Sequence, residues 1–211
     1  MPKGTSETVE LRDGSTITIR PIRADDKDVL AAGFARLSPE SRYRRFFAPL
    51  SELTPRDLAY LTEVDHHDHE ALIGFDSSTG DPVGVARYVR GAEPTEAEVA
   101  VVVVDDWQGR GVATALLDLL VSRAREEGIE HFIALVMSEN EEAIGMFDTL
   151  APDGSAQRRS ASGHTELVID LPEPGAPPDE SRLGRALRAA ARGALVANPW
   201  SLIRERIGGE R

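Results

Sequence analysis

The hydrophobic pattern of this chain is most regular between Val99 and Gly128, where two different periods follow one another. Apolar residues run without interruption from Val99 to Val104, and a short β-branched run of this kind predicts a strand buried on both faces. After a glycine-containing turn, apolar residues recur at helical spacing, at Ala113, Leu116, Leu117, Leu120 and Ala124. Gly128 predicts the end of this helix, because glycine adopts the left-handed conformation of a helix C-terminus at little cost.

Alternating apolar and polar residues predict antiparallel strands upstream of this unit. Residues Thr8 to Arg20 predict a hairpin around the two-residue turn Asp13-Gly14, a pair that tolerates the backbone angles of tight turns. Two further strands are predicted at Glu70–Asp76 and Pro82–Arg90, and a turn rich in Ser, Thr and Gly joins them.

Three helices are predicted between the hairpin and these strands. Asp25 or Asp26 is placed to cap the first, which continues to about Arg36 with an apolar stripe on one side. Ser38 and Thr54 each precede a proline, and a cap residue followed by proline predicts the start of a helix at both positions.

The second half of the chain alternates elements in the same way. A strand is predicted at His131–Met137, a helix at Asn140–Leu150, and a hairpin with strands at Gly154–Ser160 and His164–Leu171. Antiparallel strands followed by strand–helix units predict a mixed α/β domain over residues 1–171, with a mostly antiparallel central sheet flanked by helices.

A proline-rich linker at residues 172–179 is predicted to separate this domain from a helical extension at 180–211. From Asp179 onward seven arginines stand against four acidic residues, so this tail carries +3 and the rest of the chain −15. We expect the tail to dock on the acidic body of its own subunit or of a neighbouring subunit in a homodimer. Binding to a membrane surface is the alternative for a basic amphipathic helix.

Charge and cysteine content exclude several classes of function. The 211-residue chain has a net charge of −12, which argues against nucleic-acid binding and favours either basic partners or simply solubility. It contains no cysteine, so disulfides, thiolate metal ligands and a cysteine nucleophile are absent. Without an apolar run long enough to span a membrane, and without the apolar segment of a signal peptide, we expect a cytoplasmic protein.

The turn between the central strand and its helix has the features of an anion site. Its residues from Gln108 to Thr114 include Gly109 and Gly111, which let backbone approach a ligand, and Arg110, which adds positive charge. A P-loop and a dinucleotide fingerprint both require residues that are missing here. The pattern Q/R-x-x-G-x-G/A of an acyl-CoA pyrophosphate loop fits, and an ordinary packing turn is the alternative.

Two polar clusters have both a functional and a structural interpretation. Asp65–Glu70 contains three histidines, but the spacing is too tight for one helix face, so we favour a polar loop over a metal site and predict no bound metal. A weaker hypothesis places one of these histidines at the border of the pocket for the accepting substrate, where it helps with proton transfer. Arg42, Arg44 and Arg45 are candidates for cofactor phosphates, although a solvated or salt-bridged face is favoured.

Two motifs and an upstream segment together resemble the GCN5-related N-acetyltransferase (GNAT) superfamily. The first is Gln108-Gly-Arg-Gly-Val-Ala113, and the second, Asn140–Phe147, is similar to that family's N-x-x-A-x-x-[LM]-[YF]. The segments Arg20–Asp26 and Leu37–Phe46 look like the subgroup of bacterial protein-lysine acetyltransferases. The resemblance covers about Val9 to Leu171 and implies the mixed GNAT sheet.

The resemblance implies acetyl-CoA as cosubstrate and a set of residues that hold it. In the family, the strand before the glycine turn separates from its neighbour, and its backbone pairs with the pantetheine arm. The implied cofactor-binding residues are Val102, Val103, Val104, Gln108, Gly109, Arg110, Gly111, Val112, Ala113, Thr114, Asn140 and Phe147. Phe147 stands where the family often has a tyrosine that protonates the leaving thiolate, so Tyr60 or Tyr88 becomes the substitute candidate.

Glu98 is the predicted catalytic base. Glu96 and Glu98 lie two residues apart at the start of the central strand, so they face the same side. Glu98 is just inside the apolar run, where burial favours a carboxyl group able to accept a proton near neutral pH, and its position resembles the glutamate of the lysine acetyltransferase subgroup. We therefore expect direct acetyl transfer to a primary amine, preferably a protein lysine. The alternatives are a small-amine acetyltransferase and a non-catalytic acetyl-CoA sensor.

Overall fold

The computed structural model of the chain describes residues 5–46, 50–137, 156–161 and 164–171. The predicted helix at Asn140–Leu150, the linker and the C-terminal extension lie outside these residues. The described strands are Glu7–Glu10 (β1), Thr16–Pro21 (β2), His69–Asp76 (β3), Pro82–Arg90 (β4), Glu96–Val103 (β5), His131–Met137 (β6), Ala156–Ala161 (β7) and His164–Asp170 (β8). The described helices are Lys27–Ala35 (α1), Pro39–Phe46 (α2), Pro55–Thr62 (α3), the short 3₁₀ helix Asp105–Trp107 (η1) and Val112–Glu126 (α4).

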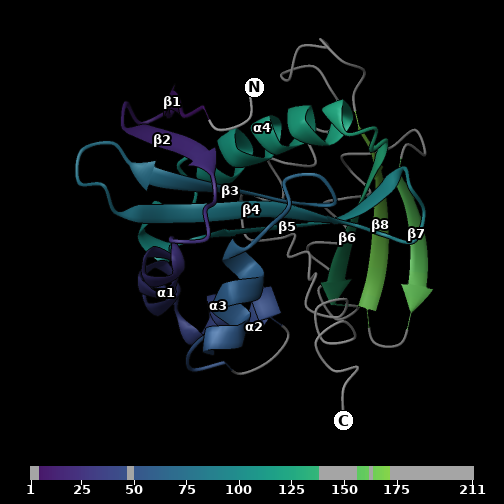
Figure 1. Cartoon of the computed structure of the whole chain (residues 1–211), viewed down its shortest axis with the longest axis horizontal. Helices are drawn as coiled ribbons and strands as arrows, with labels where there is room; N and C mark the ends of the chain where they lie inside the picture. Colours follow the sequence, from purple (N-terminus) through teal and green to yellow (C-terminus); the bar gives the residue numbers. More distant parts are fainter. Residues whose placement is uncertain (1–4, 47–49, 138–155, 162–163, 172–211) are drawn as a thin grey trace.

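The strands form one eight-stranded sheet in the order β1-β2-β3-β4-β5-β6-β8-β7. Every neighbouring pair is antiparallel except β5 and β6, which run parallel. Helix α4 covers one face of this sheet, and α1, α2 and α3 cover the other (Figure 1). This arrangement confirms the predicted mixed sheet flanked by helices.

The hairpin between β1 and β2 forms as predicted, but its connection is longer than two residues. Glu10 pairs with Thr16, so residues 11–15 make the loop. Leu11 turns into the core with 6% of its surface exposed, and its N–H donates to the Ser15 carbonyl oxygen at 2.7 Å. Burial of this leucine explains why the chain forms a wider loop around Gly14 rather than a two-residue turn.

Helices α1 and α3 begin where the sequence predicts, but with different caps. The Thr54 hydroxyl accepts from the N–H of Asp57, and the Thr54 N–H donates to the Asp57 carboxylate, which together form a capping box. The Asp26 side chain makes no cap hydrogen bond to α1. It accepts instead from the Arg23 N–H at 2.7 Å and from both terminal nitrogens of Arg20 at 2.7 Å, which fixes the end of β2 against α1.

Helix α4 buries the predicted apolar stripe against the sheet. All five stripe residues have at most 3% of their surface exposed: Ala113, Leu116, Leu117, Leu120 and Ala124. The helix starts at Val112 and ends at Glu126, and Gly128 follows with a φ of 77°, the left-handed angle predicted for its end. The stripe therefore fixes which side of α4 faces β3, β4 and β5.

Strand β5 is buried on both faces over only half of its length. Residues 97–100 are buried, whereas Val101, Val102 and Val103 are half-buried. The predicted strand buried throughout is therefore wrong for these three valines. The physical reason is that β6 pairs with β5 only up to Glu98, so the second half of β5 has a strand neighbour on one side only among the described residues.

A buried ion pair joins α4 to β3. Glu70 and Arg123 have 1% and 4% of their side chains exposed, and Arg123 Nε lies 3.4 Å from Glu70 Oε2. Glu70 Oε1 also accepts from the Ala71 N–H at 2.9 Å and contacts His66 Nδ1 at 2.7 Å. The carboxylate therefore has hydrogen-bonding partners from three directions.

Replacing Arg123 with alanine is expected to lower the free energy of unfolding by about 3–5 kcal/mol, because it leaves the Glu70 carboxylate buried without its main countercharge. Urea unfolding monitored by circular dichroism measures this loss. The double variant Glu70→Gln/Arg123→Met removes both charges and should recover part of the stability. Equal losses in the single and double variants would contradict a charge-based role for the pair.

None of the described helices is both long enough and apolar enough to cross a lipid bilayer.

Candidate active site

The two central strands separate immediately after Glu98. Strand β5 pairs with β6 at three positions, from Glu96 with His131 to Glu98 with Ile133. By contrast, β4 pairs with β5 at seven positions, and β6 pairs with β8 at seven. In the part of the chain that the structure describes, a gap between β5 and β6 therefore opens beside residues 99–103.

Backbone alternation shows which residues of β5 face this gap. The Val104 N–H donates to the Val83 carbonyl oxygen at 3.0 Å, so Val104 and, by alternation, Val102 direct their backbone groups toward β4. Val101 and Val103 then direct theirs toward the gap, where Gln108 Nε2 donates to the Val103 carbonyl oxygen at 3.1 Å. Of the three predicted valines, Val103 alone presents its backbone to the gap, and Val101 is the residue that the prediction missed.

The glycine turn leaves the backbone at the first turn of α4 without a side-chain cap. Gly109 and Gly111 have φ angles of 74° and 105°, which side chains rarely tolerate. No side chain caps the helix at Gly111, and a Cβ added there would find its nearest atom 4.0 Å away, on Leu11. The first helical turn, from Val112 to Thr114, thus has no side-chain cap at its start, and uncapped N–H groups at a helix N-terminus favour an anion.

Arg110 lies between these two glycines and is held by the β1–β2 loop. Its Nε donates to Asp13 Oδ2 at 2.5 Å, and its guanidinium lies 3.8 Å from the centroid of the Trp107 ring. Asp13 accepts in addition from the Ser15 hydroxyl and N–H, and these bonds, followed by the one from Arg110, lower the pKa of Asp13 to about 2. The carboxylate of Asp13 is therefore charged at any pH near neutrality.

The segment before the glycine turn is fixed to the first two helices. Asp105 accepts from the N–H of Ser38 at 2.8 Å and from the hydroxyl groups of Ser38 and Ser41 at 2.9 and 2.8 Å. Asp106 pairs with Arg36 at 2.9 Å. Burial acts to raise the pKa of Asp105, but the hydrogen bonds from the two serines outweigh it and lower that pKa overall.

Replacing Asp105 with alanine is expected to cost about 1 kcal/mol of stability at pH 7, the typical net contribution of a hydrogen bond, because it removes the acceptor of Ser38 and Ser41. Because the pKa of Asp105 is lowered in the folded protein, this contribution is present above pH 4 and is lost as the pH falls through the lowered pKa. Urea unfolding at pH 7 and pH 3 should therefore show a smaller difference between wild type and variant at pH 3. A difference that persists unchanged at pH 3 would contradict this.

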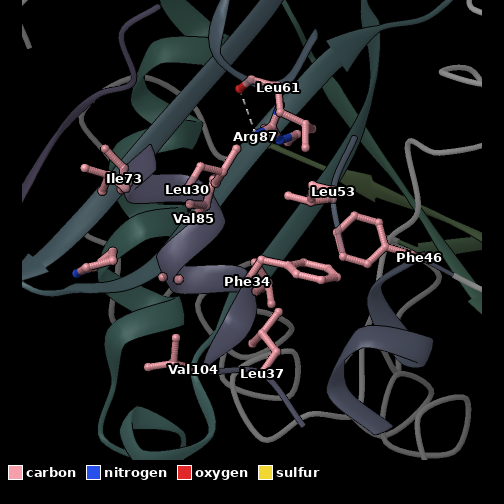
Figure 2. Close-up of a pocket in the computed structure, with 15 residues that line it drawn as sticks. Leu30, Phe34, Leu37, Phe46, Leu53, Leu61, Ile73, Val85, Arg87 and Val104 are labelled. Atoms are coloured by element: carbon pink, nitrogen blue, oxygen red, sulfur yellow. Dashed lines mark hydrogen bonds between the residues drawn. The ribbon is translucent and has the colours of Figure 1, made fainter. Parts of the chain in front are cut away.

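An apolar pocket lies between α1–α3 and the sheet, directly beside β5. Its walls include Phe34 and Phe46 from the helices, Val85 from β4, Val102 from β5 and Val104, the residue after β5. Figure 2 shows the rings of Phe34 and Phe46 next to one another, in an edge-to-face contact with their centroids 5.5 Å apart, and Arg87 beside Leu61. Apart from Arg87, the lining of this pocket is apolar, so it favours an apolar group over a charged one.

Glu98 lies on the same face of the sheet as this pocket. Arg87 lines the pocket and pairs with Ala100 across the β4–β5 ladder, and Glu98 is the next residue of β5 on that face. Glu98 has 7% of its surface exposed, and Glu96, which shares its face, is half-buried. The predicted base is thus buried where the β5–β6 gap begins and where the pocket ends.

Arg87 is a residue of this site that the sequence analysis missed. It has 1% of its surface exposed, and its guanidinium donates to the Leu61 carbonyl oxygen at 3.1 Å and contacts His69 Nε2 at 3.0 Å. Because Arg87 is always a donor, His69 Nε2 acts as the acceptor. An arginine in the middle of an otherwise apolar strand, Val83–Val89, was the sequence signal that could have found it.

The two tyrosines proposed as substitute acids lie on different faces of the sheet. Tyr88 is on the α4 face, where its hydroxyl donates to the His67 carbonyl oxygen at 3.1 Å. Burial, reinforced by Glu70 and Glu127, raises the pKa of Tyr88 far above its usual range. The Tyr60 ring lies 5.0 Å from that of His69, on the face that holds Glu98. Tyr60 therefore stays a candidate, and Tyr88 does not.

The histidine-rich segment is a polar loop with structural contacts. Among the described residues no group of histidines and carboxylates could hold a metal ion. His67 Nδ1 contacts Glu127, and Arg90 Nε pairs with Asp68 at 2.6 Å, so the loop is tied to the C-terminal end of α4 and to β4. With His66 on Glu70 and His69 on Arg87, the favoured interpretation agrees with the structure, and His69 is the histidine nearest the pocket.

The remaining predicted residues divide into one with a structural role and others outside the described residues. Arg42 donates to three backbone carbonyl oxygens, those of Ala35, Leu37 and Ser51, and its guanidinium lies over the Phe34 ring. Its contacts within the described residues are therefore structural. The side chains of Arg44 and Arg45 lie outside the described part of the chain, as do Asn140 and Phe147.

Comparison with known proteins agrees with this geometry. The model of the acetyltransferase (GNAT) family matches residues 34–151. Acetyltransferase Pat of Mycolicibacterium smegmatis is 33% identical over 190 residues, which are 90% of this chain and 56% of that protein. An acetyltransferase of Pseudomonas aeruginosa is 30% identical over 155 residues, 70% of this chain and 83% of that protein. The chain thus spans little more than half the length of the Mycolicibacterium relative.

The solved structures agree with the sequence comparison. The GNAT domain of PAT from S. lividans superposes with a TM-score of 0.68 and 36% sequence identity, over 79% of this chain and 97% of that domain. The matched family segment contains the whole of β3 to β6, the glycine turn and α4, which build the gap and the turn beside it, and also α2 and α3, which cover the pocket. On this agreement of sequence, fold and site geometry, the chain belongs to the GNAT family of acetyltransferases.

Proposed function

We propose that this protein is an acetyl-CoA-dependent N-acetyltransferase that transfers the acetyl group directly to a primary amine, preferably the side chain of a protein lysine. The observation that carries the proposal is the separation of β5 from β6 at Glu98. It leaves a backbone edge that runs from a buried carboxyl group to a glycine turn at a helix N-terminus. A pantetheine thioester with a pyrophosphate at its far end matches that sequence of features.

In this proposal the two ends of the cofactor have different partners. The backbone groups of Val101 and Val103, which face the gap, pair with the amide groups of the pantetheine arm. The pyrophosphate lies on the N–H groups of the turn, where the helix dipole and Arg110 favour negative charge. The complete proposed set adds Val102 and Val104, Gln108, Gly109, Gly111, Val112, Ala113, Thr114, Asn140 and Phe147.

The chemistry starts with the acceptor amine, which is mostly protonated at neutral pH. The Glu98 carboxylate takes one proton, directly or through a water molecule, so that the nitrogen lone pair can attack the thioester carbonyl carbon. The C–N bond forms, the C–S bond breaks, CoA leaves as a thiolate, and the second proton of the attacking nitrogen passes to solvent as the amide forms. Phe147 cannot protonate that thiolate, but a thiol with a pKa near 8.5 is a good leaving group without help.

Two candidate functions differ in the acceptor substrate. The resemblance to protein-lysine acetyltransferases and the net charge of −12 favour a lysine on a basic protein surface. The apolar lining of the pocket between α1–α3 and the sheet favours instead a small amine with an apolar body. Both candidates use the same cofactor site and the same base, so only the acceptor distinguishes them.

Thiol release with acetyl-CoA and a panel of acceptors separates these candidates. We expect lysine-containing peptides to show a kcat/KM at least about tenfold above that of any apolar small amine. A peptide whose lysine is already acetylated controls for slow hydrolysis of the thioester. A small amine that outperforms every peptide would replace the lysine proposal with the small-amine function.

A further inference from the structure

The guanidinium of Arg110 is paired with a carboxylate of the protein itself. It lies between two glycines with left-handed backbone angles at the start of α4, in the turn proposed to hold the cofactor's phosphates. Its Nε donates to Asp13 Oδ2 at 2.5 Å, although the two residues are far apart in sequence. The guanidinium also packs on the Trp107 ring at 3.8 Å, which fixes the plane in which it meets the carboxylate.

Asp13 is built into the β1–β2 loop as a fixed anion. Its Oδ1 accepts from the Ser15 N–H at 3.0 Å and from the Ser15 hydroxyl at 2.6 Å, which leaves Oδ2 for Arg110. The same loop brings Leu11 to within 4.0 Å of the position that a Cβ on Gly111 would take. The hairpin therefore presents a negative group directly beside the glycine turn.

The other two carboxylates near the turn have partners elsewhere. Asp105 accepts from Ser38 and Ser41, and Asp106 pairs with Arg36. Among these three acidic residues, Asp13 is the one that contacts Arg110. A ligand phosphate that enters the turn must therefore share Arg110 with Asp13 or displace it.

We propose that Asp13 is an internal competitor for Arg110, displaced by the phosphate groups of an acyl-CoA. It thereby lowers the affinity of the site for nucleotide-bearing donors and leaves the affinity for plain pantetheine thioesters unchanged. This inference rests on the proposed function, because it takes the glycine turn as the phosphate site. A phosphate ester offers Arg110 a stronger charge-assisted hydrogen bond than a carboxylate on a constrained loop. A neutral acylpantetheine offers no such exchange, so it leaves the pair intact.

The test substitutes Asp13→Asn and measures binding by calorimetry. The asparagine keeps an oxygen for the Ser15 turn but loses the charge that holds Arg110. Acetyl-CoA should bind about two- to fivefold more tightly, the range that exposed ion pairs supply, and the gain should shrink at high salt. Binding of acetylpantetheine should not change. Unchanged or weaker acetyl-CoA binding would overturn the proposal.

Asp76, the last residue of β3, provides a matched control. Its Oδ1 accepts from the N–H and the hydroxyl of Ser78, the same pattern as Asp13 with Ser15, but it contacts no arginine in the described residues. Asp76→Asn therefore changes the net charge and a local turn in the same way as Asp13→Asn does, but it should leave the acetyl-CoA affinity unchanged. An equal gain in both variants would mean that net charge alone acts, which would overturn the proposal.

A double-substitution cycle with Arg110→Gln isolates the pair. If Asp13 competes for Arg110, Asp13→Asn should have no effect in the Arg110→Gln background. An undiminished gain there would overturn the competition. The proposed function fails on a different result, the absence of acetyl-CoA binding by the wild-type protein, so the two failures can be told apart.

Discussion

Acetyl-CoA binding is expected to weaken at least about 100-fold when Gly111 is replaced by aspartate. Gly111 has a φ of 105° and stands at the N-terminus of α4, where the pyrophosphate is proposed to lie. A carboxylate at that position opposes the phosphates at close range, and two like charges about 4 Å apart near a protein surface cost about 4 kcal/mol. Isothermal titration calorimetry measures the affinity directly.

Two further variants separate charge from backbone strain in that experiment. Gly80 has a φ of 79° in the β3–β4 turn with open space around it, so Gly80→Asp imposes similar strain and the same charge away from the site. It should leave binding intact. Gly111→Ala imposes the strain without the charge and should weaken binding less than Gly111→Asp. Wild-type affinity in Gly111→Asp would remove the glycine turn as the pyrophosphate site.

The acetyl-transfer rate is expected to fall about 100-fold or more when Glu98 is replaced by glutamine, the usual range for loss of a general base. Glutamine keeps the size and hydrogen-bonding capacity of the side chain in its buried place at the end of the β5–β6 pairing. The affinity for acetyl-CoA should not change, because Glu98 is proposed to act on the acceptor amine. Steady-state kinetics, combined with calorimetry, distinguishes a lost base from a lost binding site.

Glu96→Gln is the matched control for this substitution. Glu96 lies on the same strand and the same face as Glu98, but it is half-buried. In the β5–β6 ladder it lies opposite His131, at the end of β5 away from the glycine turn. Its variant should retain nearly the full rate. If Glu98→Gln kept the wild-type rate over a range of pH, another group or water would have to accept the proton. If both variants lost activity equally, a general effect on β5 would explain the loss.

Local sequence signals predicted most of the fold because each needs only neighbouring residues. The cap at Thr54, the helical spacing of the apolar stripe of α4 and the left-handed Gly128 are each encoded by residues close together in the sequence. The loop between β1 and β2 was mispredicted because Leu11 turns into a core built from distant strands. Asp26 likewise binds Arg20 rather than capping α1, a choice made by the position of β2.

The site was predictable in its motif and not in its three-dimensional surroundings. The glycine spacing indicated the turn, and its left-handed angles agree with that prediction. The orientation of the β5 backbone depends on the pairing with β4, so Val101 could not be chosen over Val102 from sequence. Arg87 and the pair of Asp13 with Arg110 depend on contacts between segments far apart in the chain, which no spacing rule encodes.

The most direct test of the central claim is transfer of the acetyl group itself. The protein is incubated with isotopically labelled acetyl-CoA and a lysine-containing peptide, and mass spectrometry follows the label while a thiol reagent follows CoA release. The proposed function predicts labelled acetyl on the lysine side chain in equal amount to the CoA released, and neither with Glu98→Gln. Tight acetyl-CoA binding without transfer to any amine would contradict the enzyme and indicate a cofactor sensor.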